Sequence, residues 1–333
     1  MDWGNLPVFD DGAVFEDVQA ALAEAEQADG LPMVPPTRRR LEAMIKSVGA
    51  PDSSYGPMPP LFGDVTPAAV AYQCVLAGCK PAELPVVVTA AAACLTPDFN
   101  LLGVSTTTGT ACVVTMVHGP IAAALEMNAG TNLLGPGNRA NACIGRAVAL
   151  VLRNVGGARP LVGDMATMGQ PGKYTFCFAE ADAGDTQADI AFPSFATRHG
   201  IPAGADAVTV LGVSGTMEVL ITPPGDTPES SLASVPHIMC AGAIAGGAAR
   251  KPERGEQALL LPPEVAQLLS KRDWDLARTQ RWLFDRCNEL GTEVARKPED
   301  IHIIVAGGAG AKMTYMPLWG GGTVPATSRL VEL

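Results

Sequence analysis

The chain has 333 residues, of which 47% are hydrophobic and 17% are charged, and its formal net charge is −11 with a pI of about 4.8. This acidic balance argues against nucleic acid or an anionic membrane as a partner, because both carry negative charge themselves. The first residues lack the basic-then-apolar pattern of a signal peptide, and no run of apolar residues predicts a membrane span, so we expect a cytoplasmic protein.

Length and cysteine content limit the organisation further. Single hydrophobic cores stop growing at about 250–300 residues, so a chain of this length is expected to form two subdomains. The eight cysteines are too dilute for a disulfide scaffold, and no two of them form a CxxC pair. We therefore expect reduced thiols.

The first third of the chain predicts helices separated by proline-rich segments. Apolar spacing and capping residues predict helices over residues 14–28, 37–48 and 67–77. Residues 51–60 predict a loop. The apolar run 85–95 fits a helix or a buried strand, and its alanines favour a helix. Residues 104–117 predict one strand, or two strands joined at Gly109, and residues 120–127 predict a short helix.

The segment from Gly135 to Glu180 joins a glycine-rich turn, an amphipathic helix and a strand. Asn138 is a good N-cap for a helix over residues 139–154, and Gly156 and Gly157 would end it. One apolar stripe of this helix consists of Ile144, Val148, Val151 and Val155. A second face carries Arg139, Arg146 and Arg153, with Arg159 just beyond the helix.

The start of this helix predicts a binding site for a carboxylate or phosphate. The free N–H groups of its first turn, the helix dipole and Arg139 would attract an anion, and we expect Gly137, Asn138 and Asn141 to contribute. In the alternative interpretation the arginines pair with carboxylates and the glycines only shape a turn. The segment matches neither the Walker pattern nor GxGxxG, so ATP and NAD are not indicated and the cofactor stays open.

The C-terminal half predicts alternating strands and helices. The predicted strands cover residues 174–179, 208–213, 217–221, 258–261 and 301–306, and the predicted helices cover residues 230–249, the segment up to Lys271, and 273–290. This alternation predicts an α/β fold with mixed or parallel sheets flanked by helices. We expect a helical and extended segment at 1–60 and two α/β subdomains at 61–185 and 190–333, divided near the acidic loop 182–189. A weak duplication is open, because both halves pass from helices to a strand and a glycine-rich turn.

Four side chains are candidates for chemistry. Cys79 precedes Lys80 and Cys177 follows Lys173, so either thiol is a candidate low-pKa nucleophile, whereas the other six cysteines are expected to pack as small apolar residues. Lys173 is a candidate for anion binding or amine chemistry, with a surface lysine as the alternative. His118 is a candidate acid or base, with a structural imidazole as the alternative.

A second glycine-rich turn follows the strand predicted at 301–306. Backbone N–H groups of such a turn lie beside a ligand in many α/β proteins, so we expect Gly308, Gly310 and Lys312 to contribute to substrate binding. The four histidines have no metal-ligand spacing, so no metal site is predicted. No serine lies in GxSxG, which argues against an α/β-hydrolase.

Several segments together resemble a known family. They are Ala77-Gly78-Cys79, GPGNRAN at 135–141, GQPGKYTFCFAE at 169–180, VAGGAG at 305–310 and WGGG at 319–322, and DGLPMVPPT at 29–37 also fits. The chain resembles, over nearly its whole length, a bacterial family encoded beside, or fused to, proteins with a UGSC motif, in which U is selenocysteine or is replaced by cysteine. The resemblance implies a companion polypeptide with a reactive selenol or thiol, and small-molecule redox, transfer or elimination chemistry. The chain itself contains no UGSC or CGSC.

The leading hypothesis is an enzyme that acts on a small anionic metabolite by thiol-dependent redox or lyase-type chemistry rather than hydrolysis. Asn138, Arg139 and Lys173 would bind the anion, and Cys79 or Cys177 with His118 would supply nucleophile or proton transfer. The alternative is a non-catalytic scaffold subunit of a hetero-oligomer whose partner carries the reactive thiol or selenol. We also expect a homo-oligomer, from the alanine- and glycine-rich residues 230–249, and an Arg139→Ala variant that folds but loses ligand affinity.

Overall fold

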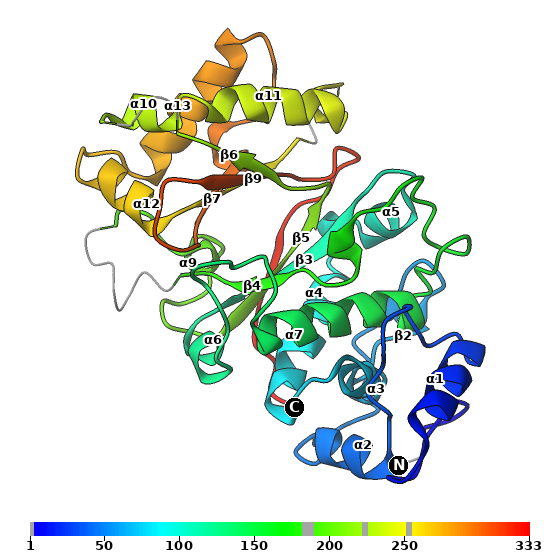
Figure 1. The fold of residues 1–333 in the computed structure, drawn as a ribbon. Helices are drawn as coiled ribbons and strands as arrows, with labels where there is room; N and C mark the ends of the chain where they lie inside the picture. The colour runs from blue at the N-terminus through cyan, green and yellow to red at the C-terminus, as the bar shows by residue number, and fades with distance from the viewer. Residues whose placement is uncertain (1–2, 182–189, 222–225, 251–254) are drawn as a thin grey trace.

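Two four-stranded sheets pack face to face and carry helices on their outer faces (Figure 1). The computed structural model describes residues 3–181, 190–221, 226–250 and 255–333. Both sheets contain parallel and antiparallel pairs, so the predicted α/β class is confirmed. The predicted acidic loop 182–189 lies outside the described residues.

The elements have the following bounds. The strands are β1 (Pro57–Met58), β2 (Gly63–Asp64), β3 (Cys112–His118), β4 (Cys177–Ala179), β5 (Ala207–Val213), β6 (Met217–Val219), β7 (Gln257–Leu261), β8 (Ile301–Val305), β9 (Met313–Pro317) and β10 (Ala326–Arg329). The α-helices are α1 (Phe15–Glu24), α2 (Arg38–Ile45), α3 (Pro67–Ala77), α4 (Leu84–Ala93), α5 (Leu101–Thr106), α6 (Pro120–Ala124), α7 (Arg139–Leu150), α9 (Phe195–Arg198), α10 (Pro228–Leu232), α11 (Val235–Ala245), α12 (Pro263–Ser270) and α13 (Leu276–Glu289). Short helical turns are η1 (Pro81–Glu83), η2 (Pro97–Phe99), η3 (Val151–Val155), η4 (Pro171–Lys173), η5 (Ala248–Arg250) and η7 (Pro298–Asp300).

The two sheets repeat one topology. The first has the order β10-β5-β3-β4 and the second β6-β9-β7-β8, and in each the two inner strands are antiparallel while β3/β4 and β7/β8 are parallel. Matching rows of paired residues cross both sheets: Phe178, Met116, Thr209 and Thr327 in the first, and Ile304, Leu260, Thr314 and Glu218 in the second. The duplication left open by the sequence is therefore present in the topology.

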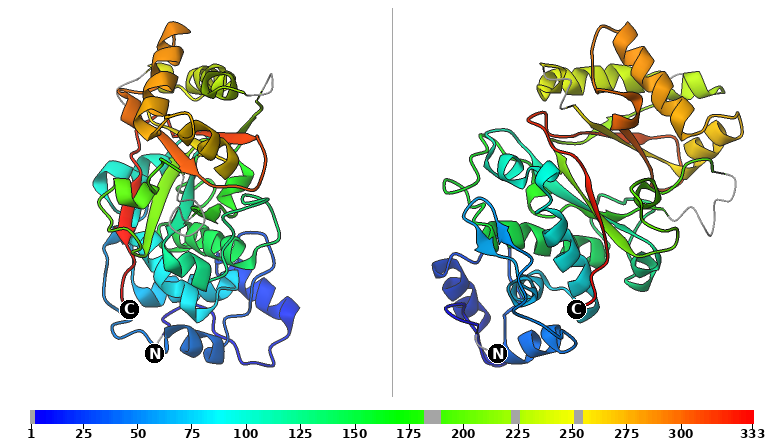
Figure 2. Two further views of the ribbon diagram at one scale, coloured as in Figure 1. Left: turned by 90° about the vertical axis from the view of Figure 1, so that its left-hand side faces the viewer. Right: turned by 180° about the vertical axis from the view of Figure 1, so that it is seen from behind.

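The halves also exchange their edge strands. The chain passes from β5 in the first sheet directly to β6 in the second, and from β9 in the second back to β10 in the first. Figure 2 shows this C-terminal return as the red segment that runs back along the first sheet. Because β5 and β10 lie beyond residue 190 yet belong to the first sheet, the predicted division between 61–185 and 190–333 does not separate the two sheets.

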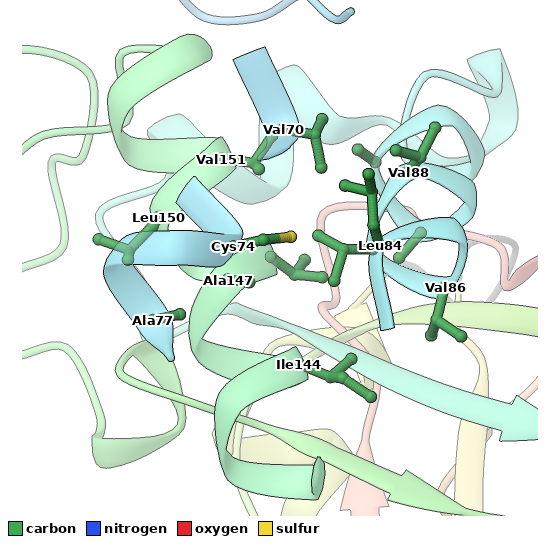
Figure 3. Close-up of a cluster of buried hydrophobic side chains, with 14 of the residues drawn as sticks. Val70, Cys74, Ala77, Leu84, Val86, Val88, Ile144, Ala147, Leu150 and Val151 are labelled. Carbon is green, nitrogen blue, oxygen red and sulfur yellow. The ribbon is translucent and has the colours of Figure 1, made fainter. Parts of the chain in front are cut away.

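Alternation along the strands produces three apolar layers. Val113 and Val117 of β3 face the helices outside the first sheet, whereas Val114 and Met116 face the second sheet. Figure 3 shows the outer layer, in which apolar side chains of α3, α4 and α7 meet. The second sheet packs in the same way against α11 and α13 on its outer face. Each sheet is thus covered on both faces.

The central helix follows its prediction closely. Asn138 Oδ1 accepts a hydrogen bond from the N–H of Asn141, and Ile144, Val148 and Val151 are buried. The last turn, η3, widens to a π-helix. Such turns are rare and occur often at functional sites.

Other predictions succeed or fail for identifiable local reasons. The helix predicted at 85–95 is confirmed as α4, but residues 101–106, expected in part as strand, form α5 because Asn100 caps them. The helix predicted over 230–249 is split into α10 and α11, since Pro236 lacks the N–H that would continue the first helix. Strands β9 and β10 were not predicted. Within the described residues no single helix is long and apolar enough to cross a membrane. The bent pair Pro81–Ala93 and Pro97–Thr106 reaches that length and apolar composition only when the two helices are taken together.

Replacing Gly145 by alanine tests the contact between α7 and β4. Alanine normally favours a helix over glycine by about 1 kcal/mol, but here its Cβ would lie 2.8 Å from the backbone nitrogen of Phe176. We expect a net loss of about 1–3 kcal/mol in the free energy of unfolding, measured by urea denaturation. Gly215→Ala, whose Cβ meets no atom within 4 Å, is the matched control and should stay within about 0.5 kcal/mol of wild type. An unchanged or raised stability of Gly145→Ala would contradict this packing.

Candidate functional site

The first turn of α7, predicted as an anion site, is occupied by its own side chains. Asn138 caps the helix and donates its amide hydrogen to the Glu126 carbonyl at 2.8 Å. The side-chain amide of Asn141 accepts a hydrogen bond from the N–H of Asn128 and donates one to the Asn128 carbonyl, both at 3.0 Å. Gly137 has a φ of 122° and shapes the turn before the cap. These residues hold the loop that precedes α7, so the structure gives them a structural role.

Arg139 turns away from the helix start and binds a buried carboxylate. Its guanidinium forms a two-point ion pair with Glu83, whose side chain is 0% exposed, and it also donates to the Gly78 carbonyl at 3.4 Å. The hydrogen bond to Glu83 raises the pKa of Arg139. Arg146 is likewise paired with Asp29, at 2.8 Å, and Arg159 with Glu26. For these arginines the structure supports the alternative interpretation.

Arg153 differs from the other three arginines. Its Nη1 donates at 2.6 Å to the Glu26 carbonyl and to Asn154 Oδ1, but among the described residues no carboxylate lies within ion-pair distance. Burial, and then the neighbouring charge of Arg159, lower the pKa of Arg153. Its positive charge is therefore only weakly compensated within the described chain.

Neither predicted thiol has the environment of a low-pKa nucleophile. Gly78 adopts a φ of 86°, and the N–H of Cys79 bonds the Cys74 carbonyl at 2.9 Å, which is the Schellman end of α3. A hydrogen bond with the Cys74 thiol, and then burial, raise the pKa of Cys79 well above its usual value. Cys177 is buried between β4 and the helices, and burial raises its pKa too. Both shifts are opposite to the predicted direction.

His118 is held between two buried partners. Its Nδ1 lies 2.8 Å from Glu180 Oε2 and its Nε2 lies 2.7 Å from Thr209 Oγ1. Glu180 also accepts the N–H of Phe195, and Thr209 bonds Thr327 on the neighbouring strand. With 4% of its surface exposed and both nitrogens bonded, His118 has the surroundings of a structural imidazole joining β3 to β4 and β5.

The glycine turn after β8 is engaged in contacts of its own. Gly310 N donates to Glu264 at 2.8 Å, and Gly308 packs so closely on Thr131 that no side chain would fit. Lys312 pairs with Glu218 at 3.1 Å on the exposed surface. None of these three residues lines the cavity at Lys173 described next.

Lys173, in contrast, lies in a cavity of about 660 Å³. Its Nζ bonds both oxygens of Asp164, at 2.6 and 2.7 Å, and the two side chains are only 23% and 18% exposed. The cavity is bounded by the start of β3, by α5, by the end of α7 with η3, and by the loop 158–174. The cavity is thus lined by the Lys173–Asp164 ion pair, by Arg153 and by apolar side chains.

The loop 158–174 is fixed to the start of β3 by specific contacts. Gln170 Nε2 donates to the carbonyls of Thr110 and Val213, at 2.6 and 3.1 Å, and the N–H of Thr167 donates to the Thr108 carbonyl. A Cβ on Gly172 would lie 2.9 Å from Cys112 Sγ, so only glycine allows this approach. These contacts hold the loop in place as one wall of the cavity.

Cys112 is the thiol that reaches this cavity. Burial raises its pKa to about 12, and the charge of Lys173 opposes this only in part. The thiol is therefore protonated at neutral pH and a poor nucleophile there. Sequence reasoning assigned Cys112 to packing and overlooked Asp164, because neither role shows before the fold brings both beside Lys173.

A second cavity, of about 580 Å³, follows α13 as the first follows α7. Its cation, Arg296, is paired with Glu256 and Asp300 at 2.8 and 2.7 Å. Because these two carboxylates balance the charge of Arg296, the second cavity attracts an anionic ligand less strongly than the first cavity does. Within the described residues no three His, Cys, Asp or Glu side chains gather as metal ligands would.

Compared with models of known protein families and with curated protein sequences, the chain matches none.

Removing Arg139 should destabilise the protein, because Glu83 would keep a buried charge without its partner. We expect Arg139→Ala to lower the free energy of unfolding by about 1–3 kcal/mol, measured by urea denaturation. Arg39→Ala is the matched control, since that arginine is 70% exposed and its pair with Asp11 should contribute far less to stability. Equal stability of the two variants would show that the pair with Glu83 does not support the fold.

Alkylation of the native protein should be slow at both predicted thiols. Only the thiolate reacts, and a raised pKa moves thiolate formation to higher pH, so labelling of Cys79 and Cys177 by iodoacetamide should still increase above about pH 9. Mass-spectrometric mapping against the denatured protein, in which all eight thiols are open, measures this. Labelling of either residue near neutral pH at the denatured rate would contradict the structure.

Proposed function

We propose that the chain is an enzyme that binds a small anionic metabolite in the cavity of Lys173 and transforms it by lyase-type proton transfer. The observation that supports this most is the half-buried Arg153, a weakly compensated cation lining the same cavity as the Lys173–Asp164 pair. An anionic group of the ligand would pair with Arg153. A volume of about 660 Å³ is within the range of small-molecule sites.

The ion pair supplies both proton transfers that an elimination requires. Asp164 accepts a proton from the ligand, and the Lys173 ammonium donates one to the leaving group, so the pair as a whole keeps its charge. This assignment keeps Lys173 from the original hypothesis and replaces Cys79, Cys177 and His118.

The second candidate function is the scaffold subunit, and one observation favours it. The loop 158–174 exposes Leu161 and Met168, which are 90% and 88% exposed. Val162 and Met165 of the same loop are also exposed, and several exposed apolar side chains in one segment are typical of a contact with another molecule. A thiol- or selenol-bearing partner and a homo-oligomer stay predictions.

Profiling of metabolite conversion tests the proposal. The purified chain is incubated with the small-molecule fraction of a bacterial extract, and mass spectrometry follows which compounds are consumed or formed. We expect conversion of an anionic compound, and a loss of at least about 100-fold in rate for Lys173→Met and for Asp164→Asn. Lys312→Met, which removes an exposed lysine outside the cavity, is the matched control and should retain the rate.

Two outcomes would contradict the enzyme assignment. If the wild-type chain alone converts no compound, the result favours the scaffold subunit over the enzyme. If Lys173→Met converts the same compound at the wild-type rate, the chemistry lies outside this cavity.

A further inference from the structure

The charges around the cavity leave room for one anionic group only. Asp29 is bound at two points by Arg146, and Asp164 at two points by Lys173, so both acids carry their own cation. Arg153 is the remaining charge, and no protein acceptor among the described residues bonds its Nε or Nη2. These donors are available to a single carboxylate.

Most of the remaining wall is apolar. The side chains that provide it are Val104, Val113, Leu150, Leu152, Ala158 and Met168. A polyanionic or polyhydroxylated ligand would leave its polar groups unpaired against this wall, which is unfavourable. The wall therefore favours a ligand with an apolar body.

The rim continues the apolar surface outward. Met168 belongs to the wall yet is 88% exposed, and Leu161, which follows Pro160 of the wall, is 90% exposed. Leu161 also has a φ of 66°, a left-handed conformation that is costly for a branched side chain. The chain thus keeps a strained backbone and an exposed leucine beside the cavity without a packing benefit inside the protein.

From Arg153, which has no carboxylate partner among the described residues, from the apolar wall and from this rim we infer that the ligand is an amphipathic monocarboxylate, whose carboxylate pairs with Arg153 and whose apolar body lies along the wall toward Met168 and Leu161. The inference rests on the proposed function and specifies its substrate class. It concerns binding alone, so it is tested without knowledge of the reaction.

Isothermal titration calorimetry with straight-chain carboxylates tests the inference. Affinity should rise about twofold to fourfold per methylene from butanoate through hexanoate to octanoate, and inorganic phosphate should bind more weakly than octanoate. Octanamide, which has the same apolar body without charge, should bind at least about tenfold more weakly than octanoate. Arg153→Gln should lose the same factor for every carboxylate, and Arg153→Lys should recover part of it.

A second variant isolates the apolar contact. Met168→Gln, which adds no charge, should weaken octanoate binding severalfold while leaving butanoate nearly unchanged, and Ile244→Gln, at an apolar residue 60% exposed on α11, should change neither. If affinity depends on Arg153 but is flat along the series, or if phosphate binds best, the substrate class is wrong and the anion site stands. If Ile244→Gln acts like Met168→Gln, the apolar body binds elsewhere and the inference fails. If none of the anions binds, the proposed function fails with it.

Discussion

Parallel pairing of β3 with β4 is the constraint on which the site depends. Parallel strands cannot be joined by a tight turn, so the chain must leave the end of β3, cross the outer face as α7 and return to the start of β4. The return loop, residues 158–174, therefore arrives beside the start of β3, where Gln170 is bonded to Thr110. The cavity forms between that loop and the strand. The same constraint acts on β7 and β8, and the second cavity is lined by α13 and the segment that follows it.

Duplication of the topology did not produce two equivalent sites. In the first half the return loop brings an ion pair and a weakly compensated arginine to one cavity. In the second half Arg296 is shared by two carboxylates, Glu256 and Asp300, so its charge is already balanced. The exchange of β6 and β10 between the sheets links the two halves through their edge strands.

Local signals in the sequence predicted most elements but not the site. Signals between neighbouring residues are present in the structure as expected. They are the N-cap Asn138, the apolar stripe of α7 and the proline that begins α3. The ion pair of Arg139 could not be assigned from the sequence, because its partner, Glu83, lies 56 positions away and only the packing of α7 near η1 brings the two together. Lys173 was singled out from the sequence and lines the cavity, whereas its partner Asp164 carries no pattern of its own. The pKa values of the cysteines could not be predicted from the sequence either, because burial raises them and burial depends on the fold.

The central claim is that ligands bind between the loop 158–174 and the start of β3. A crystal structure grown with 8-bromooctanoate tests it most directly, because the anomalous signal of bromine locates the apolar end of the ligand independently of its carboxylate. The account predicts a carboxylate within about 3.2 Å of the Arg153 guanidinium and a bromine peak along the apolar wall toward Met168. Ligand density at the first turn of α7, around Gly137 and Arg139, with none beside Arg153 would contradict it.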